Sequence, residues 1–243
     1  MGVGSILTSI IAVFVIFINK FVLGIYFKYN IVIIYNYNVK KSKGEINMPY
    51  PGSLKKSLEK YNVDEKIIMK IYEGYEDIKD NSPKKIKVTF MRRAMNILDE
   101  NFDYEKRYEI IDNCACCLGG TTEKNVKKFI KSIQGQSLSF AEKIQALREQ
   151  RPFYNLTHLN EDGTITDGIH YLVDGRYKCA CDCISKEKLT EPISSTYCLC
   201  CAGHFRHHIQ KALGVKLKTK KVQSSAIESL EKEPCVFVFE VIE

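Results

Sequence analysis

Cysteine and histidine are concentrated in the second half of this 243-residue chain in a pattern that could bind a soft metal. Nine of the ten cysteines fall in the short stretches 114–117, 179–183 and 198–201. The histidines His204, His207 and His208 follow the last stretch directly. Adjacent cysteines and Cys-x-Cys pairs are poor disulfide partners, and the chain is long enough to build a hydrophobic core without disulfides. The pattern therefore favours reduced thiols in an intracellular compartment, and a thiolate metal or iron–sulfur site.

The spacing limits how one ion could be held. Residues two apart on a strand are separated by about 6.5–7 Å, whereas sulfur ligands of one zinc ion lie within about 4 Å of each other. One ion is therefore expected to take one or two sulfurs from each of several clusters. A hairpin and the loop 184–197 could bring Cys181 and Cys183 beside Cys198 and Cys200. His204 lies four residues after Cys200 and four before His208, so it could complete a Cys₃His site.

The clusters supply four further candidate ligands: Cys114, Cys117, Cys179 and Cys201. Cys235 stands alone before an apolar run, and we expect it to be a buried hydrophobic residue. The spacings match neither a zinc ribbon nor a ferredoxin, so zinc is the first choice of cofactor and an iron–sulfur cluster the second. Redox-active thiols and inert packing remain alternatives.

No second chemical signature accompanies the cysteines. The chain has no G-x-G-x-x-G, no phosphate-binding P-loop and no nucleophile elbow. Whether the protein is an enzyme therefore stays open. The leading hypothesis is a metal-binding domain that senses or binds a small molecule in a pocket beside the cysteines. The alternatives are a metal-dependent or thiol hydrolase and a redox thiol protein.

The first half of the chain is expected to be helical, so helices must pack around the cysteine-rich second half and position it. Apolar residues recur with helical spacing after Ser53, after Asp64, between 86 and 98, and after Asp103. Asn81-Ser82-Pro83 and Gly119-Gly120 interrupt the pattern. Residues 123–134 are expected to be helical, and Ser139 with Glu142 matches a capping box that opens a helix to about residue 150.

After Pro152 the pattern favours strands. Strands are expected at 153–159, from Ile165 to Val173, at 177–182, 215–223 and 236–242, with a helix over 203–213 that Gly214 ends. The predicted fold class is therefore α+β, with a helical half followed by an antiparallel sheet and a packed helix. Residues 48–150 and 151–243 would form one domain, preceded by a hydrophobic segment over 1–47.

Residues 3–27 are strongly apolar and are interrupted by Lys20. The length is close to what a membrane-spanning helix needs, and the segment lacks the features of a cleaved signal peptide. If it spans, the lysines that follow place its C-terminal side in the cytoplasm, at the inner face of the membrane. The composition of residues 25–38, almost all Ile, Tyr, Asn, Val, Phe and Lys, is typical of A/T-rich coding, and Met48-Pro49 resembles a conventional start. Residues 1–47 are therefore equally well explained as an over-called translation start.

The net charge of +7 does not indicate nucleic-acid binding, because five lysines and a single acid fall in residues 1–47. The one local basic run consists of Lys216, Lys218, Lys220 and Lys221. These lysines are expected to protect the edge of a sheet.

Residues 179–239 resemble a known group of proteins. The resemblance rests on the Cys-x-Cys element at 179–183, Ser195-Thr196-Tyr197-Cys198-Leu199-Cys200, Leu213-Gly214-Val215, and Ser225 followed by Pro234-Cys235-Val236-Phe237. These elements look like an uncharacterised cysteine-rich bacterial and archaeal family, akin to 4-vinyl-reductase-like and aminothiazoline-carboxylate hydrolase-like domains. The resemblance implies an α+β domain with a ligand pocket between sheet and helices. It also implies that Cys181, Cys183, Cys198 and Cys200 are the core ligands, with a cysteine of the 114–117 cluster nearby.

Overall fold

The computed structural model describes residues 50–115, 118–149, 156–185 and 187–242. All of them belong to one unit that runs from Asn38 to Glu243. The apolar segment 3–27 and the cysteines Cys116 and Cys117 lie outside the described residues. Within the described ranges, every helix is too short or too polar to cross a membrane.

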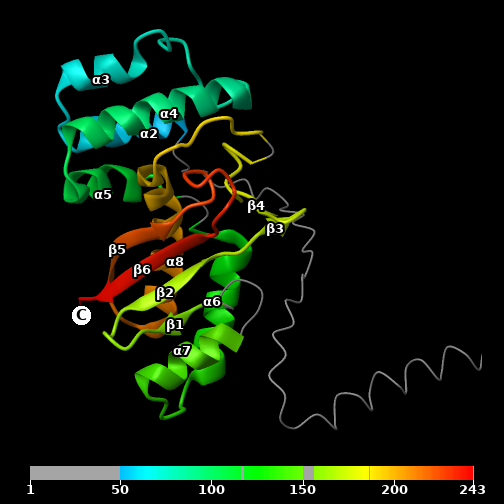
Figure 1. Cartoon of the computed structure of the whole chain (residues 1–243). Coiled ribbons are helices and arrows are strands. Elements are labelled where there is room, and N and C mark those ends of the chain that lie inside the picture. Colours follow the sequence, from blue (N-terminus) through cyan, green and yellow to red (C-terminus); the bar gives the residue numbers. More distant parts are fainter. Residues whose placement is uncertain (1–49, 116–117, 150–155, 186, 243) are drawn as a thin grey trace, which may run out of the picture. The chain divides into compact units, whose positions relative to one another are not determined.

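Four helices form the first layer (Figure 1). They are α2 (Pro51–Lys60), α3 (Glu65–Tyr72), α4 (Lys84–Asn101) and α5 (Tyr104–Asp112). The Asp64 and Asp103 side chains cap α3 and α5, accepting hydrogen bonds from Lys66 N (2.8 Å) and Lys106 N (2.9 Å). Their shared core contains fully buried leucine, methionine and phenylalanine side chains: Leu54, Leu58, Phe90, Met91, Met95 and Leu98.

Two further helices, α6 (Gly120–Ile133) and α7 (Phe140–Glu149), connect this layer to the sheet. The predicted capping box opens α7. The backbone N of Ser139 donates to Glu142 Oε2 (2.7 Å), and Glu142 N donates to Ser139 Oγ (3.3 Å). The box holds the first turn of α7, since each side chain accepts a hydrogen bond from the other residue's backbone.

The main sheet is antiparallel and has the strand order β1-β2-β6-β5. Its strands are β1 (His158–Leu159), β2 (Ile165–Ile169), β5 (Leu217–Ser224) and β6 (Cys235–Val241). Strand β6 is central, and its Phe237 and Phe239 are fully buried. Strand β5 lies at the edge, so the lysines Lys218, Lys220 and Lys221 line a sheet edge, as predicted. Tyr104 Oη on α5 also donates to Thr219 O of this edge strand (2.9 Å).

Helix α8 (Leu199–Leu213) lies along one face of the sheet, behind it in Figure 1. Phe205 of α8 packs on Phe237 of β6 with ring centroids 5.5 Å apart. Gly203 lets the end of α5 approach the helix, because a Cβ there would lie 2.9 Å from Asp112 Oδ1 and 3.0 Å from Ala115 Cβ. Gly214 ends α8 in the left-handed conformation (φ 72°), as predicted.

The predicted strand over 177–182 is wrong. A short hairpin of β3 (Leu172–Val173) and β4 (Arg176–Tyr177) stands in its place, and residues 182–185 form a turn. The turn is closed by Ile184 N and Ser185 N, which both donate to Cys181 O (3.0 and 2.6 Å). The expected strand over 165–173 is likewise divided, since β2 ends at Ile169 and β3 begins at Leu172. The helical half followed by an antiparallel sheet and a packed helix is confirmed.

Candidate metal centre

The segment that carries Cys179, Cys181 and Cys183 is held by a turn after β5. The backbone N of Tyr177 donates to Glu231 O (3.0 Å), and Lys178 Nζ donates to Glu231 Oε2 (2.6 Å). Glu231 has a left-handed backbone (φ 69°) that non-glycine residues rarely adopt. The bend after Cys181 means that the three cysteines do not form the one-faced row that a strand would have given.

Cys181 lies against Tyr197, a buried residue that directly precedes the third cysteine cluster. Its Sγ is 3.1 Å from Tyr197 Oη, and Cys181 N donates to Cys179 Sγ (3.4 Å). A hydrogen bond that the Cys179 thiol donates to Cys181, followed by burial, raises the pKa of Cys179 well above its usual value. Burial, and next the neighbouring Cys181, raise the pKa of Cys183 to about 11. These thiols are therefore protonated at neutral pH when no cation compensates them.

Cys198 and Cys235 form a second pair of neighbouring thiols. They belong to the 3₁₀ turn η1 (Ser195–Cys198) and to the first position of β6. Cys198 Sγ is 3.1 Å from Ser225 Oγ, and Ala226 N donates to Cys235 Sγ (3.5 Å). The hydrogen bond between the two thiols raises the pKa of Cys198 and lowers that of Cys235. Cys235 is buried as predicted, but it is also part of the thiol group, which sequence reasoning did not foresee.

Cys201 lies within electrostatic range of both pairs. A negative charge on its thiol would raise the pKa of both Cys179 and Cys198. We call Cys179, Cys181, Cys198, Cys201 and Cys235 the thiol group. It unites residues from three stretches of the chain that are distant in sequence.

The first cysteine cluster approaches this region from α5. Cys200 Sγ donates to Cys114 O (3.2 Å), which places the end of α5 against the start of α8. An ion pair strengthens this contact, because Arg206 Nε and Nη2 lie 3.2 and 2.5 Å from the two carboxylate oxygens of Asp112. Cys114 itself donates toward Ile110 O (3.5 Å), and burial raises its pKa to about 12. Cys114 therefore lies against Cys200 of the third cluster, while Cys117 lies outside the described residues.

The donor chemistry of the thiol group fits a thiophilic metal, since soft thiolates select zinc, copper(I) and iron–sulfur clusters. The eight cysteines that the structure describes carry no disulfide, and Cys181, Cys183, Cys198 and Cys200 are at most 6 % exposed. Within the described residues, however, no three sulfurs converge to 4.8 Å of one another. A metal bound here would have to draw the two thiol pairs together.

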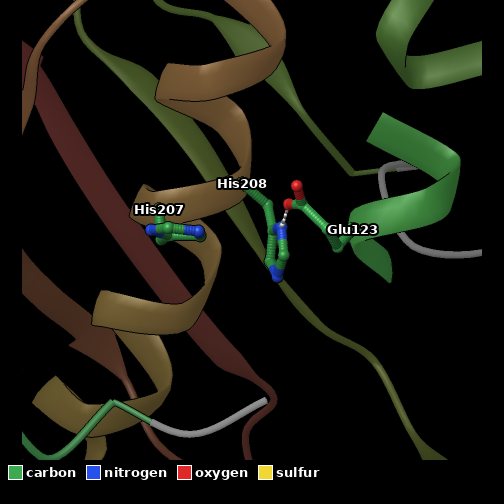
Figure 2. Close-up of side chains that lie close together, drawn as sticks. All are labelled: Glu123, His207 and His208. Atoms are coloured by element: carbon green, nitrogen blue, oxygen red, sulfur yellow. Dashed lines mark ion pairs between the residues drawn. The ribbon is translucent and has the colours of Figure 1, made fainter. Parts of the chain in front are cut away.

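The predicted ligand His204 lies with the other histidines. Its ring centroid is 4.8 Å from that of His208 and 5.5 Å from that of Phe205. The described residues place three metal-binding atoms within 4.8 Å of one another at one location only, formed by Glu123, His207 and His208 (Figure 2). Glu123 comes from α6 and was missed, since nothing in its sequence neighbourhood indicates a ligand. Only the structure shows that α6 packs on the histidine-bearing face of α8.

A buried acid lies in the sheet on β2, where it pairs with Phe237 of β6. Asp167 of β2 is 1 % exposed and accepts hydrogen bonds from Thr157 Oγ1 and Gly168 N (both 2.7 Å). Burial raises its pKa to about 7, although both hydrogen bonds oppose the shift. The next residue, Gly168, pairs with Val236, and a Cβ there would lie 2.1 Å from Cys235 O.

Comparison with other proteins adds no constraint on this site. No family model matches the chain, and no curated protein and no solved structure is significantly similar to it. The family resemblance of residues 179–239 therefore stays an expectation that rests on the motifs themselves.

Proposed function

We propose that this protein binds a thiophilic metal, zinc or an iron–sulfur cluster, through cysteines of its thiol group and their neighbours Cys183 and Cys200. The observation that carries the proposal is the convergence of thiols from three distant stretches of the chain without a disulfide among the described cysteines. A hydrophobic core can be built from aliphatic side chains alone, so packing does not account for so many adjacent thiols.

The buried environment is consistent with binding that is coupled to proton release. Thiols must lose their protons to become ligands, and a bound cation supplies the charge that makes this favourable. For this reason the raised pKa values of Cys179, Cys183 and Cys198 do not oppose metal binding. They imply that affinity rises with pH.

We further propose that the metal holds together a domain that binds a small molecule. The metal would fasten the 179–185 segment to α8, because its ligands lie on both. An open hollow of about 410 Å³ is lined by Arg92, Asn96, Glu191, Pro192, Ser194 and Glu228. Its polar and charged lining suits a small polar ligand.

Metal analysis of the full chain tests this proposal. The protein is purified under anaerobic conditions in mild detergent, and its zinc, iron and sulfide contents and its visible absorption are measured. We expect stoichiometric zinc without a visible band, or iron with sulfide and a broad band. The Cys198→Ser, Cys200→Ser double variant should lose the metal and unfold at lower temperature. Tyr197→Phe, which keeps every thiol, should retain the metal.

A redox function is the second candidate, and the contact between Cys198 and Cys235 favours it. Reaction with a disulfide of another molecule would form a Cys198–Cys235 bond and return two reduced thiols to that molecule. This candidate predicts metal-free protein whose two thiols disappear together on oxidation. Metal-free protein in which the double variant folds as the parent does would overturn the metal proposal and leave this one.

A further inference from the structure

The carboxylate of Glu123 lies between α6 and α8 with its two oxygens in different surroundings. Oε1 faces two lysines, Lys211 Nζ at 2.5 Å and Lys127 Nζ at 3.4 Å. Oε2 is buried and accepts no hydrogen bond from the described residues; the nitrogen His208 Nδ1 lies 4.0 Å from it. Buried polar atoms almost always have a partner, and one that has none often marks the place of an ion or water.

Two imidazoles complete a candidate ligand set with the Glu123 carboxylate. His207 and His208 are consecutive residues of α8, and their ring centroids are 5.0 Å apart. His208 is fully buried, whereas His207 is only partly buried. Figure 2 shows Glu123 reaching from α6 toward His208, with His207 on the adjacent side of α8. One ligand atom from each of the three residues lies within 4.8 Å of the other two.

The distances are close to those of a metal site. Zinc binds imidazole nitrogen and carboxylate oxygen at about 2.0–2.2 Å, so ligand atoms of one ion are separated by roughly 3.3–3.6 Å. The group would therefore have to contract by about 1 Å, which side-chain rotation can supply. The partly exposed His207 has the most freedom to make that movement. Two histidines and one carboxylate also form a known zinc ligand set that leaves a fourth position open.

The nearby positive charges do not occupy the place of the ion. Both lysines bind Oε1, so Oε2 is left to face His208. A lysine on the second oxygen of a ligating carboxylate fixes its orientation, as outer-shell hydrogen bonds commonly do. The guanidinium of Arg206 is held by Asp112, on the side of α5. The ring of His204 makes an edge-to-face contact with that of His208, with centroids 4.8 Å apart.

We propose that Glu123, His207 and His208 form a second metal site that binds Zn²⁺ or a similar divalent ion through one oxygen and two nitrogens. Its fourth position is open to water. The site is independent of the thiol group, since it uses none of its residues. It would join α6 to α8, and its imidazole and carboxylate ligands suit ions such as Zn²⁺ and Ni²⁺.

Titration of the metal-free full chain with Co²⁺ tests this site. Thiolate-bound Co²⁺ has strong sulfur-to-metal charge-transfer absorption, whereas Co²⁺ bound by nitrogen and oxygen has only weak visible bands. We expect one equivalent of Co²⁺ with only weak visible bands, bound by nitrogen and oxygen, in the parent protein and in the Cys198→Ser, Cys200→Ser variant. That equivalent should bind at least about tenfold more weakly in Glu123→Gln and in His207→Gln.

Two controls keep the outcome decisive. His170→Gln removes an exposed imidazole outside the group and should bind Co²⁺ as the parent does. Circular dichroism of each variant reports folding, and His207→Gln is preferred to a change at the fully buried His208 for that reason. The proposal is overturned if the parent binds Co²⁺ with sulfur absorption alone, or if Glu123→Gln and His207→Gln both keep the nitrogen-bound equivalent. A parent protein that binds Co²⁺ without any sulfur absorption would count against the thiol proposal and leave this one standing.

Discussion

The thiol group and the Glu123, His207 and His208 group are built by different means. The thiols lie on the irregular segment 178–181, on η1, in the first turn of α8 and on the first residue of β6. Contacts with Tyr197, Ser225 and Ala226 hold three of them in place. The second group spans two regular helices, α6 and α8, which position it through their packing. The thiol group thus depends on local backbone geometry, and the second group depends on the angle and distance between helices.

The two groups also differ in how they share α8. Cys200 and Cys201 lie in its first turn, and His207 and His208 lie two turns further on. A disturbance at the N-terminal end of the helix should therefore affect the thiols first. A disturbance of the α6 contact should affect the histidines and leave the thiols in place.

The largest expected effect is at the strand pair that supports Cys235. Gly168→Ala would place a Cβ 2.1 Å from Cys235 O, an overlap with backbone that a side-chain movement cannot relieve. We expect a loss of at least about 4 kcal/mol of unfolding free energy, measured by urea denaturation. Thiol-reactive reagent should also modify the thiol group faster.

Gly119→Ala is the matched control, because a Cβ there meets nothing within 4 Å. It should lower stability by about 1 kcal/mol or less through the cap of α6. If the two alanine variants were equally stable, β6 would not be the support of the thiol group.

A pH effect should appear in the same strand. The folded-state pKa of Asp167 is about 7, above the ordinary 3.8, because the buried site favours the neutral acid. Between pH 4 and 7 the folded state therefore binds more protons than the unfolded state, and stability falls as pH rises. The full shift corresponds to at most about 4 kcal/mol across that window.

Asp167→Asn should remove this slope, since the amide keeps an oxygen for Gly168 N and a group for Thr157 Oγ1. Thermal denaturation at pH 5 and pH 7.5 would measure it. We expect the variant to be less sensitive to pH than the parent and relatively more stable at pH 7.5. An identical pH profile in both proteins would show that Asp167 is ionised in the fold.

A smaller effect is expected where α5 meets α8, beside both groups. Arg206→Gln leaves the Asp112 carboxylate partly buried without its cation, which should cost about 3 kcal/mol of unfolding free energy. Burial is the largest influence on Asp112 and already raises its pKa. The Asp112→Asn, Arg206→Gln double variant should recover part of the loss, as measured by a double-mutant cycle. If the double variant lost the sum of the unfolding free energies that the two single variants lose, the ion pair would not couple the helices.

The smallest effect is expected at the cap of α7. Ser139→Ala removes the hydroxyl that accepts from Glu142 N and should cost about 1 kcal/mol in thermal or urea denaturation. Neither metal content nor Co²⁺ binding should change. A change in either would show that α7 takes part in positioning a donor group.

Sequence reasoning succeeded where the signal is local. The caps at Asp64, Asp103 and Ser139 and the stop at Gly214 all depend on residues within one turn of each other. It failed at the 177–182 strand, where alternating residues also suit the extended start of a turn. It placed the start of α8 at 203 instead of Leu199, since cysteines have no strong helix preference.

The site was partly predictable for the same reason. The short connection between the second and third clusters limits their separation, so their approach follows from chain length. Cys235 and Glu123 join their groups through contacts between segments that are distant along the chain, 37 residues from Cys198 in one case and 85 from His208 in the other. The spacing of apolar residues along the sequence does not predict such contacts, because they arise from the packing of whole helices and strands.

The uneven burial of the thiols implies an order of chemical modification. Cys179 and Cys201 are partly exposed, whereas Cys181, Cys183, Cys198 and Cys200 are buried. An alkylating reagent should label the first two in the native protein and reach the others only when the 179–185 turn or the start of α8 opens. The order in which mass spectrometry detects the labels over time would therefore rank the local opening motions by how readily they occur. The cysteines serve as probes already present in the chain.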